Sequence, residues 1–258
     1  MTTARLDDVI ARLRAAGCVF AEDEARLLTD ATGTPSELGA LVARRVGGEP
    51  LEHVLGWVEF CGLRIAVDPG VFVPRRRTEV LVREAAALAA PGAIVVDLCC
   101  GSGALGVALA SVVDEVELHA ADLDPAAVAC ARRNVEAIGG RVYVGDLFDA
   151  LPSSLRGRVD VLLANVPYVP SHGIGSMPRE AREHEPRSAL DGGRDGLDVA
   201  RRVVAGAPGW LRPGGSLLFE TGESQAPAAV DVVAGSGLRA RVVTDDDRGA
   251  TVVVVTRV

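Results

Sequence analysis

Four consecutive residues, Asn165-Val166-Pro167-Tyr168, combine a side-chain amide, a free backbone carbonyl and an aromatic ring directly after an apolar run. The Asn165 side-chain oxygen and the Val166 carbonyl can accept hydrogen bonds from a nucleophilic nitrogen and so orient its lone pair toward an electrophilic methyl group. Tyr168 supplies a flat packing surface. Asn and Pro are also ordinary turn residues, so the tetrapeptide alone is compatible with a plain strand-ending turn.

A glycine-rich stretch earlier in the chain is typical of a turn whose backbone approaches a ligand. Residues 97–103 read Asp-Leu-Cys-Cys-Gly-Ser-Gly and lead directly into an expected helix, whose first N–H groups are free to bind a polar group. Gly101, Gly103 and Gly106 also fit the GxGxxG dinucleotide pattern. That pattern is weak on its own, because a tight strand–helix turn without a ligand can show it too.

Asp122 closes the next expected strand, about twenty residues after the glycine stretch. A carboxylate there can accept hydrogen bonds from both hydroxyls of a ribose, whereas Asp124 is the better candidate for capping the helix that follows. The glycine stretch and Asp122 together indicate a nucleoside-type cofactor and leave both NAD and S-adenosylmethionine open. The 165–168 motif favours S-adenosylmethionine, because it has no role in hydride transfer.

The elements that must position these residues alternate between apolar strands and helices. Because such strands are buried on both faces, the pattern predicts an α/β fold with a mostly parallel sheet covered by helices on both sides. Ligands then bind at the carboxyl ends of the strands, where the three motifs lie. The last two expected strands are predicted to be antiparallel. The expected strands are 93–98, 116–122, 141–146, 159–165, 215–221, 239–244 and 250–258.

The first part of the chain follows a different pattern. Apolar residues at helical spacing and a capping box from Thr34 to Glu37 predict three short helices in a small bundle. Residues 56–68 predict a hairpin with Gly62 at its turn, followed by a Pro- and Gly-containing linker. We therefore expect a helical bundle over residues 1–50, a hairpin and linker over 51–75, and the α/β domain over 76–258.

Composition excludes several classes of protein. The net charge is −8, so the broad basic surface of a nucleic-acid binder is not expected. All 27 basic residues are arginine, which excludes Schiff-base chemistry and a Walker phosphate loop. The five cysteines and four histidines show no metal-ligand spacing, and no disulfides are expected. Neither a signal peptide nor a membrane span is expected, so the simplest location is the cytoplasm.

Several motifs together resemble one family. The stretches GWVEFCGL, VFVPRRRTEVLV, GDLFDAL, ANVPYVP, EPRSALDGGRDGLDVARRV and LRPGGSLLFETGESQ, with the glycine stretch, are similar to the release-factor glutamine methyltransferases, the HemK family. The resemblance runs from about Gly56 to the C-terminus. It implies a class I S-adenosylmethionine-dependent methyltransferase fold, Rossmann-like with seven strands, preceded by a small helical domain. It also implies methyl transfer to a glutamine amide in a peptide chain release factor, with the N-terminal bundle as the partner-binding element.

The resemblance also implies roles for residues of this chain. Its cofactor loop falls on residues 99–103, its ribose acid on Asp122, its adenine-side pair on 146–147 and its substrate-holding motif on 165–168, while Phe72 matches a position over the cofactor. The candidate catalytic residues are Asn165, Val166, Pro167 and Tyr168. The candidate S-adenosyl-L-methionine-binding residues are Phe72, Asp97, Cys99, Cys100, Gly101, Ser102, Gly103, Asp122, Asp146, Leu147 and Asn165; no metal ligand is expected.

The chain departs from the family pattern in four places. Val166 replaces a proline, Cys99 replaces a glycine, PRRRTE replaces the more usual Pro-Arg-Pro-acid-Thr-Glu, and the N-terminal bundle is shorter. We expect methyl transfer to be retained, with an altered substrate preference. The alternatives are a methyltransferase acting on a small metabolite or a nucleic-acid amino group, an NAD-linked oxidoreductase, and a cofactor-binding but inactive partner protein.

Overall fold

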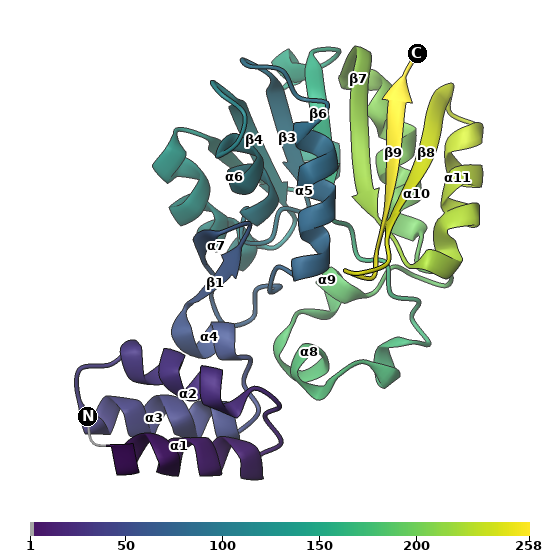
Figure 1. Cartoon of the computed structure of the whole chain (residues 1–258). Coiled ribbons are helices and arrows are strands. Elements are labelled where there is room, and N and C mark those ends of the chain that lie inside the picture. The colour runs from purple at the N-terminus through teal and green to yellow at the C-terminus, as the bar shows by residue number, and fades with distance from the viewer. Residues whose placement is uncertain (1–2) are drawn as a thin grey trace.

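The computed structural model describes residues 3–258 and begins with a helical bundle (Figure 1). The capping box is confirmed: the Glu37 amide donates to the Thr34 hydroxyl, and the Thr34 amide donates to the Glu37 carboxylate at 3.0 Å. A fourth short helix follows the three expected ones, and its Val54 packs into the apolar cluster of the bundle. The bundle helices are α1 (Thr3–Ala15), α2 (Ala21–Asp30), α3 (Pro35–Val46) and α4 (Leu51–Leu55).

The hairpin lies where the sequence predicts it, as β1 (Trp57–Phe60) and β2 (Leu63–Ala66). Gly62 at its turn has a φ of +75°, a left-handed conformation that glycine adopts without strain. The chain then runs through the linker to a 3₁₀ turn, η1 (Arg76–Thr78), which opens α5 (Glu79–Ala86). The division of the chain at residues 50 and 75 stays a prediction.

The main sheet has seven strands in the order β5-β4-β3-β6-β7-β9-β8. Every pair from β5 to β7 is parallel, and β9 pairs antiparallel with both β7 and β8, which confirms the expected topology. The order places the ends of β3, β4 and β6 next to one another. The strands are β3 (Ile94–Leu98), β4 (Glu117–Asp122), β5 (Arg141–Val144), β6 (Val159–Ala164), β7 (Leu211–Glu220), β8 (Leu238–Asp245) and β9 (Ala250–Arg257).

Helices cover both faces of the sheet, because alternate strand residues point to opposite sides. On one face α5, α6 (Ala104–Ala110) and α7 (Pro125–Val135) share an apolar cluster with Val95 and Val161. On the other face α10 (Asp198–Gly206) and α11 (Ala226–Ala234) pack with Val96 and Leu162. The remaining 3₁₀ turns are η2 (Glu136–Ile138), η3 (Leu147–Ala150), η4 (Ser153–Leu155), η5 (Ile174–Ser176), η6 (Ala207–Gly209) and η7 (Glu223–Gln225).

Residues 169–193, which we call the cover segment, hold two short helices that the sequence did not predict, α8 (Arg179–His184) and α9 (Arg187–Leu190). Figure 1 shows this segment beside the bundle and below the sheet. Arg45 of α3 connects the two parts: its buried guanidinium pairs with Glu24 of α2 and with Glu180 of α8. Across the described residues, no helix has the length and apolar character needed to cross a membrane.

Candidate active site

The glycine stretch forms a tight loop between β3 and α6. Gly101 and Gly103 have φ angles of +55° and +77°, and a Cβ atom on Gly103 would lie 2.6 Å from Val135 Cγ2, so only glycine fits there. Cys99 has a φ of +54°, a left-handed conformation that is uncommon for a residue with a side chain. This position therefore favours glycine, which explains why the related pattern has glycine where this chain has Cys99.

Asp122 lies at the end of β4 and is tied to the loop. Its carboxylate accepts hydrogen bonds from the amides of Gly101, at 2.8 Å, and Asp124, at 2.9 Å. Burial raises the pKa of Asp122, while these amides oppose the shift. Asp124 caps α7 by accepting from the Ala126 amide at 2.8 Å, as the sequence predicts. Asp122 is thus not needed as a cap, and its free lone pairs can accept from a ligand.

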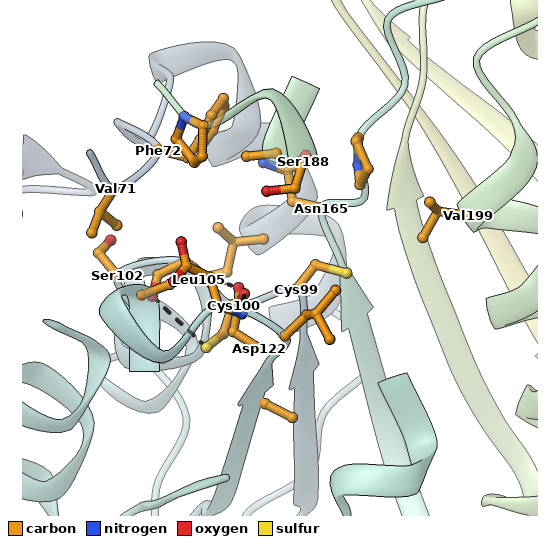
Figure 2. Close-up of a pocket in the computed structure, with 18 of the residues that line it drawn as sticks. Val71, Phe72, Cys99, Cys100, Ser102, Leu105, Asp122, Asn165, Ser188 and Val199 are labelled. Atoms are coloured by element: carbon orange, nitrogen blue, oxygen red, sulfur yellow. Dashed lines mark hydrogen bonds between the residues drawn. The ribbon is translucent and has the colours of Figure 1, made fainter. Parts of the chain in front are cut away.

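A cavity of about 370 Å³ lies at the carboxyl ends of β3, β4 and β6 (Figure 2). In Figure 2, Phe72, Ser188 and Asn165 lie on one side of it, and Ser102, Cys100 and Asp122 lie on the other. Its wall is mostly apolar with a few polar groups, as is usual for cofactor sites. The predicted site residues that line it are Phe72, Cys99, Cys100, Gly101, Ser102, Asp122, Asp146, Leu147, Asn165 and Pro167.

Four predicted residues do not line this cavity: Asp97, Gly103, Val166 and Tyr168. Asp97 is fully buried behind the loop, where its carboxylate accepts from the Gly106 amide at 3.0 Å. Burial raises its pKa to about 7. Asp97 therefore supports the start of α6 from beneath, and Gly103 lets the loop pack closely against α7.

The Asn165–Tyr168 motif begins directly after β6, and Asn165 is shared by two cavities. A smaller cavity of about 40 Å³ adjoins the first and is lined by Phe72, Arg75, Arg77, Asn165, Val166, Tyr168, Val169, Met177, Ala189 and Leu190. The Asn165 Oδ1 atom is buried, and no group among the described residues donates a hydrogen bond to it. An unpaired buried acceptor is costly, so this atom is suited to bind a donor that the protein itself does not supply.

Several residues near the site were not predicted from the sequence. Arg202 of α10 lines the larger cavity and pairs with Asp146 at 2.7 Å. Arg75 lies over the Phe72 ring, 5.0 Å from its centroid, and pairs with the buried Glu185 of the cover segment. The PRRRTE and EPRSAL stretches, which carry part of the family resemblance, contain Arg75 and Glu185. Nothing in either stretch indicated that the two side chains would meet.

The comparisons with known proteins agree with this geometry. The family model described as methyltransferase small domain matches residues 62–178. A release factor glutamine methyltransferase from Geobacter sulfurreducens is 42% identical over 229 residues, which is 87% of this chain and 80% of the relative. The chain belongs to the release factor glutamine methyltransferase family. Its membership confirms the resemblance and the methyltransferase assignment, and it decides against the NAD-linked oxidoreductase.

One further relative and one solved structure are also similar to this chain. A 4-amino-L-phenylalanine/4-methylamino-L-phenylalanine methyltransferase from Streptomyces pristinaespiralis is 39% identical over 200 residues, 74% of this chain and 67% of the relative. The solved structure of a methyltransferase from Pyrococcus furiosus superposes with a TM-score of 0.57 at 16% identity, covering 76% of this chain and 88% of that one. This likeness confirms the class I methyltransferase fold, and family membership implies the use of S-adenosylmethionine in general.

Proposed function

We propose that this protein transfers the methyl group of S-adenosylmethionine to the side-chain amide nitrogen of a glutamine in a peptide chain release factor. Family membership supports the reaction, and the name of the Geobacter sulfurreducens relative supports the acceptor. The single observation that carries the proposal is Asn165 Oδ1, a buried acceptor to which no residue of the described chain donates, on the wall shared by the larger and the smaller cavity.

The residues around the larger cavity fit the proposed cofactor. Asp122 is suited to the ribose hydroxyls, Asp146 and Leu147 to the adenine side, and the loop at 99–103 to the methionine moiety. Ser102 adds a buried hydroxyl that has no hydrogen-bond partner within the described part of the chain. When bound, S-adenosylmethionine supplies an electrophilic methyl group on a positively charged sulfur. The cavity volume and the acidic side chains suit a cofactor with that charge.

The role of the protein in the reaction is then mainly one of orientation. Asn165 Oδ1 and the Val166 carbonyl accept the two N–H bonds of the glutamine amide, which directs the nitrogen lone pair toward the larger cavity. Val166 lacks the fixed φ of proline, yet Pro167 after it still favours an extended backbone. The amide proton leaves to water after attack.

The proposal is tested by incubating the protein with labelled S-adenosylmethionine and a purified release factor, and then mapping the modified residue by mass spectrometry. We expect one methyl group on one glutamine side chain. Absence of label from the release factor, with label on another acceptor, would refute the proposed acceptor while keeping the methyltransferase activity.

A small aromatic amine is the second candidate acceptor. The 39% identical relative from Streptomyces pristinaespiralis is named for methylation of 4-amino-L-phenylalanine, and Val166 marks a departure in the motif that holds the acceptor. The two candidates are separated by offering the release factor and 4-amino-L-phenylalanine in separate reactions. We expect kcat/KM to be far higher for the release factor.

We also propose that the release factor docks on the N-terminal bundle and that the protein works in the cytoplasm without nucleic acid. The bundle exposes Val19 and Phe20, which are 83% and 68% exposed, in the turn between α1 and α2. The substitution Phe20→Asp should raise KM for the whole release factor and leave KM for a short glutamine peptide unchanged. Equal effects on both acceptors would refute docking at this turn.

A further inference from the structure

The carboxylate of Glu220, at the end of β7, binds groups from two other parts of the chain. Its side chain is 2% exposed. Oε1 accepts from the Tyr168 hydroxyl at 2.6 Å and from Arg77 Nε at 2.9 Å, and Oε2 accepts from the Thr78 hydroxyl at 2.6 Å. Glu220 therefore joins the turn η1 and the end of β6 to the end of β7.

Arg77 closes this group of hydrogen bonds into a ring. Its Nη2 donates to the Tyr168 hydroxyl at 2.7 Å, while its Nε donates to Glu220. The planar fork of an arginine holds two acceptors at once in a fixed geometry, which the flexible ammonium group of a lysine does less well. The Tyr168 hydroxyl thus donates to Glu220 and accepts from Arg77. Burial raises the pKa of Tyr168 well above its usual value, so the hydroxyl keeps its proton across the working pH range.

The ring of hydrogen bonds holds one wall of the smaller cavity. Tyr168 and Arg77 both line that cavity, beside Asn165. The backbone of Tyr168 is held separately, because its carbonyl accepts from Gln225 Nε2 at 2.9 Å. Tyr168 is therefore fixed at both ends, by Gln225 at its backbone and by Glu220 and Arg77 at its hydroxyl. An aromatic side chain held in this way has little freedom left to move.

We propose that Glu220 and Arg77 are positioning residues that fix the Tyr168 ring as a wall against the acceptor's amide group. The inference rests on the proposed function, because it takes the smaller cavity as the acceptor side. Arg77 stands where the PRRRTE stretch departs from the more usual acid. An acid at this position could not donate to Tyr168 and would repel Glu220, so this ring of hydrogen bonds depends on a residue particular to this chain.

The test compares Tyr168→Phe, Glu220→Gln and the double variant by steady-state kinetics and by calorimetry with S-adenosylhomocysteine. Each single change removes the equivalent of about one charge-assisted hydrogen bond, so we expect the acceptor KM to rise by about tenfold. We expect the dissociation constant of S-adenosylhomocysteine to change by less than about twofold, because neither Tyr168 nor Glu220 lines the larger cavity. The acceptor KM of the double variant should be no higher than that of the more affected single variant, since both substitutions disrupt the same hydrogen bond between Tyr168 and Glu220.

The chain offers a matched control, because it has only two tyrosines. The Tyr143 hydroxyl hydrogen-bonds His119 at 3.0 Å on β5 and β4, away from both cavities. Tyr143→Phe therefore removes an equivalent hydroxyl and should leave the acceptor KM unchanged. Arg77→Glu, which restores the acid of the related pattern, should match the effect of Glu220→Gln. Arg77→Lys should recover part of the loss.

Three results would overturn the inference. The first is an acceptor KM that is unchanged in Tyr168→Phe, and the second is a double variant in which the two single effects on KM multiply. The third is a loss of S-adenosylhomocysteine affinity as large as the rise in the acceptor KM, which would indicate a general structural role. Should Glu220→Gln fail to fold, Tyr168→Phe still decides, because it removes a single oxygen atom. An inactive wild-type protein would refute the proposed function instead. The hydrogen bond between Tyr168 and Glu220 is then tested by measuring the free energies of unfolding of the wild type, both single variants and the double variant. If the two substitutions show no coupling in these free energies, the inference is overturned.

Discussion

Replacing Asp122 with alanine should weaken the binding of S-adenosylhomocysteine by roughly a hundredfold. The carboxylate is already held by the Gly101 and Asp124 amides, and it offers its remaining lone pairs to the cavity. Two hydrogen bonds from ribose hydroxyls to a charged acceptor are worth about 1.5–3 kcal/mol each. The further desolvation of the carboxylate on binding reduces this sum, which leaves about 3 kcal/mol.

The dissociation constant is measured by isothermal calorimetry on the wild type, Asp122→Ala and Asp122→Asn. Asparagine keeps one acceptor oxygen, so Asp122→Asn should fall between the other two. Thr34→Ala is the control for stability, because it removes the cap of α3 in the distant bundle at a cost of about 1 kcal/mol. It should leave the affinity unchanged. A folded Asp122→Ala variant that binds within about threefold of the wild type would refute the ribose contact.

Three further predictions concern the loop and the acceptor motif. Asn165→Ala should abolish turnover and weaken S-adenosylhomocysteine binding far less, although Asn165 also lines the larger cavity; normal turnover would rule out the role given to its side-chain oxygen. Gly103→Ala should lower the free energy of unfolding, measured with urea, by about 2–4 kcal/mol, because a left-handed alanine is strained and its Cβ meets Val135; an unchanged midpoint would contradict this. Asp97, whose folded pKa is about 7, binds its proton more tightly when folded, so its contribution to stability is present below pH 4 and is lost as pH rises to about 7. Between pH 5 and pH 8 the wild type should lose about 2–3 kcal/mol more than Asp97→Asn, and parallel pH profiles would show that this group is not titrating.

Local sequence signals were sufficient for much of the fold. The caps of α3 and α7 were predicted because Thr34 and Asp124 act on amides only two or three residues away. The strands were predicted because their apolar runs are bounded by glycine, proline and acidic residues. The short helices of the cover segment were missed, because α9 has four residues and shows no periodicity that could be read.

The site was harder to predict where it depends on strand order. Glu220 meets Tyr168 only because β7 lies beside β6, and the two residues are 52 positions apart. Asp97 was placed at the cofactor because it belongs to the glycine stretch. Its position inside β3 instead points it under α6, and the motif pattern does not distinguish these two directions.

The ion pair between Arg45 and Glu180 connects the N-terminal bundle to the segment that forms part of the wall of the larger cavity. Glu180 belongs to the same segment as Ser188 and Ala189, which form part of that cavity's wall. Arg45 is buried and also pairs with Glu24, so its guanidinium cannot follow α8 without leaving a charge uncompensated inside the bundle. We therefore expect a partner that shifts the bundle to displace α8 as well, and with it the cavity-lining residues Ser188 and Ala189.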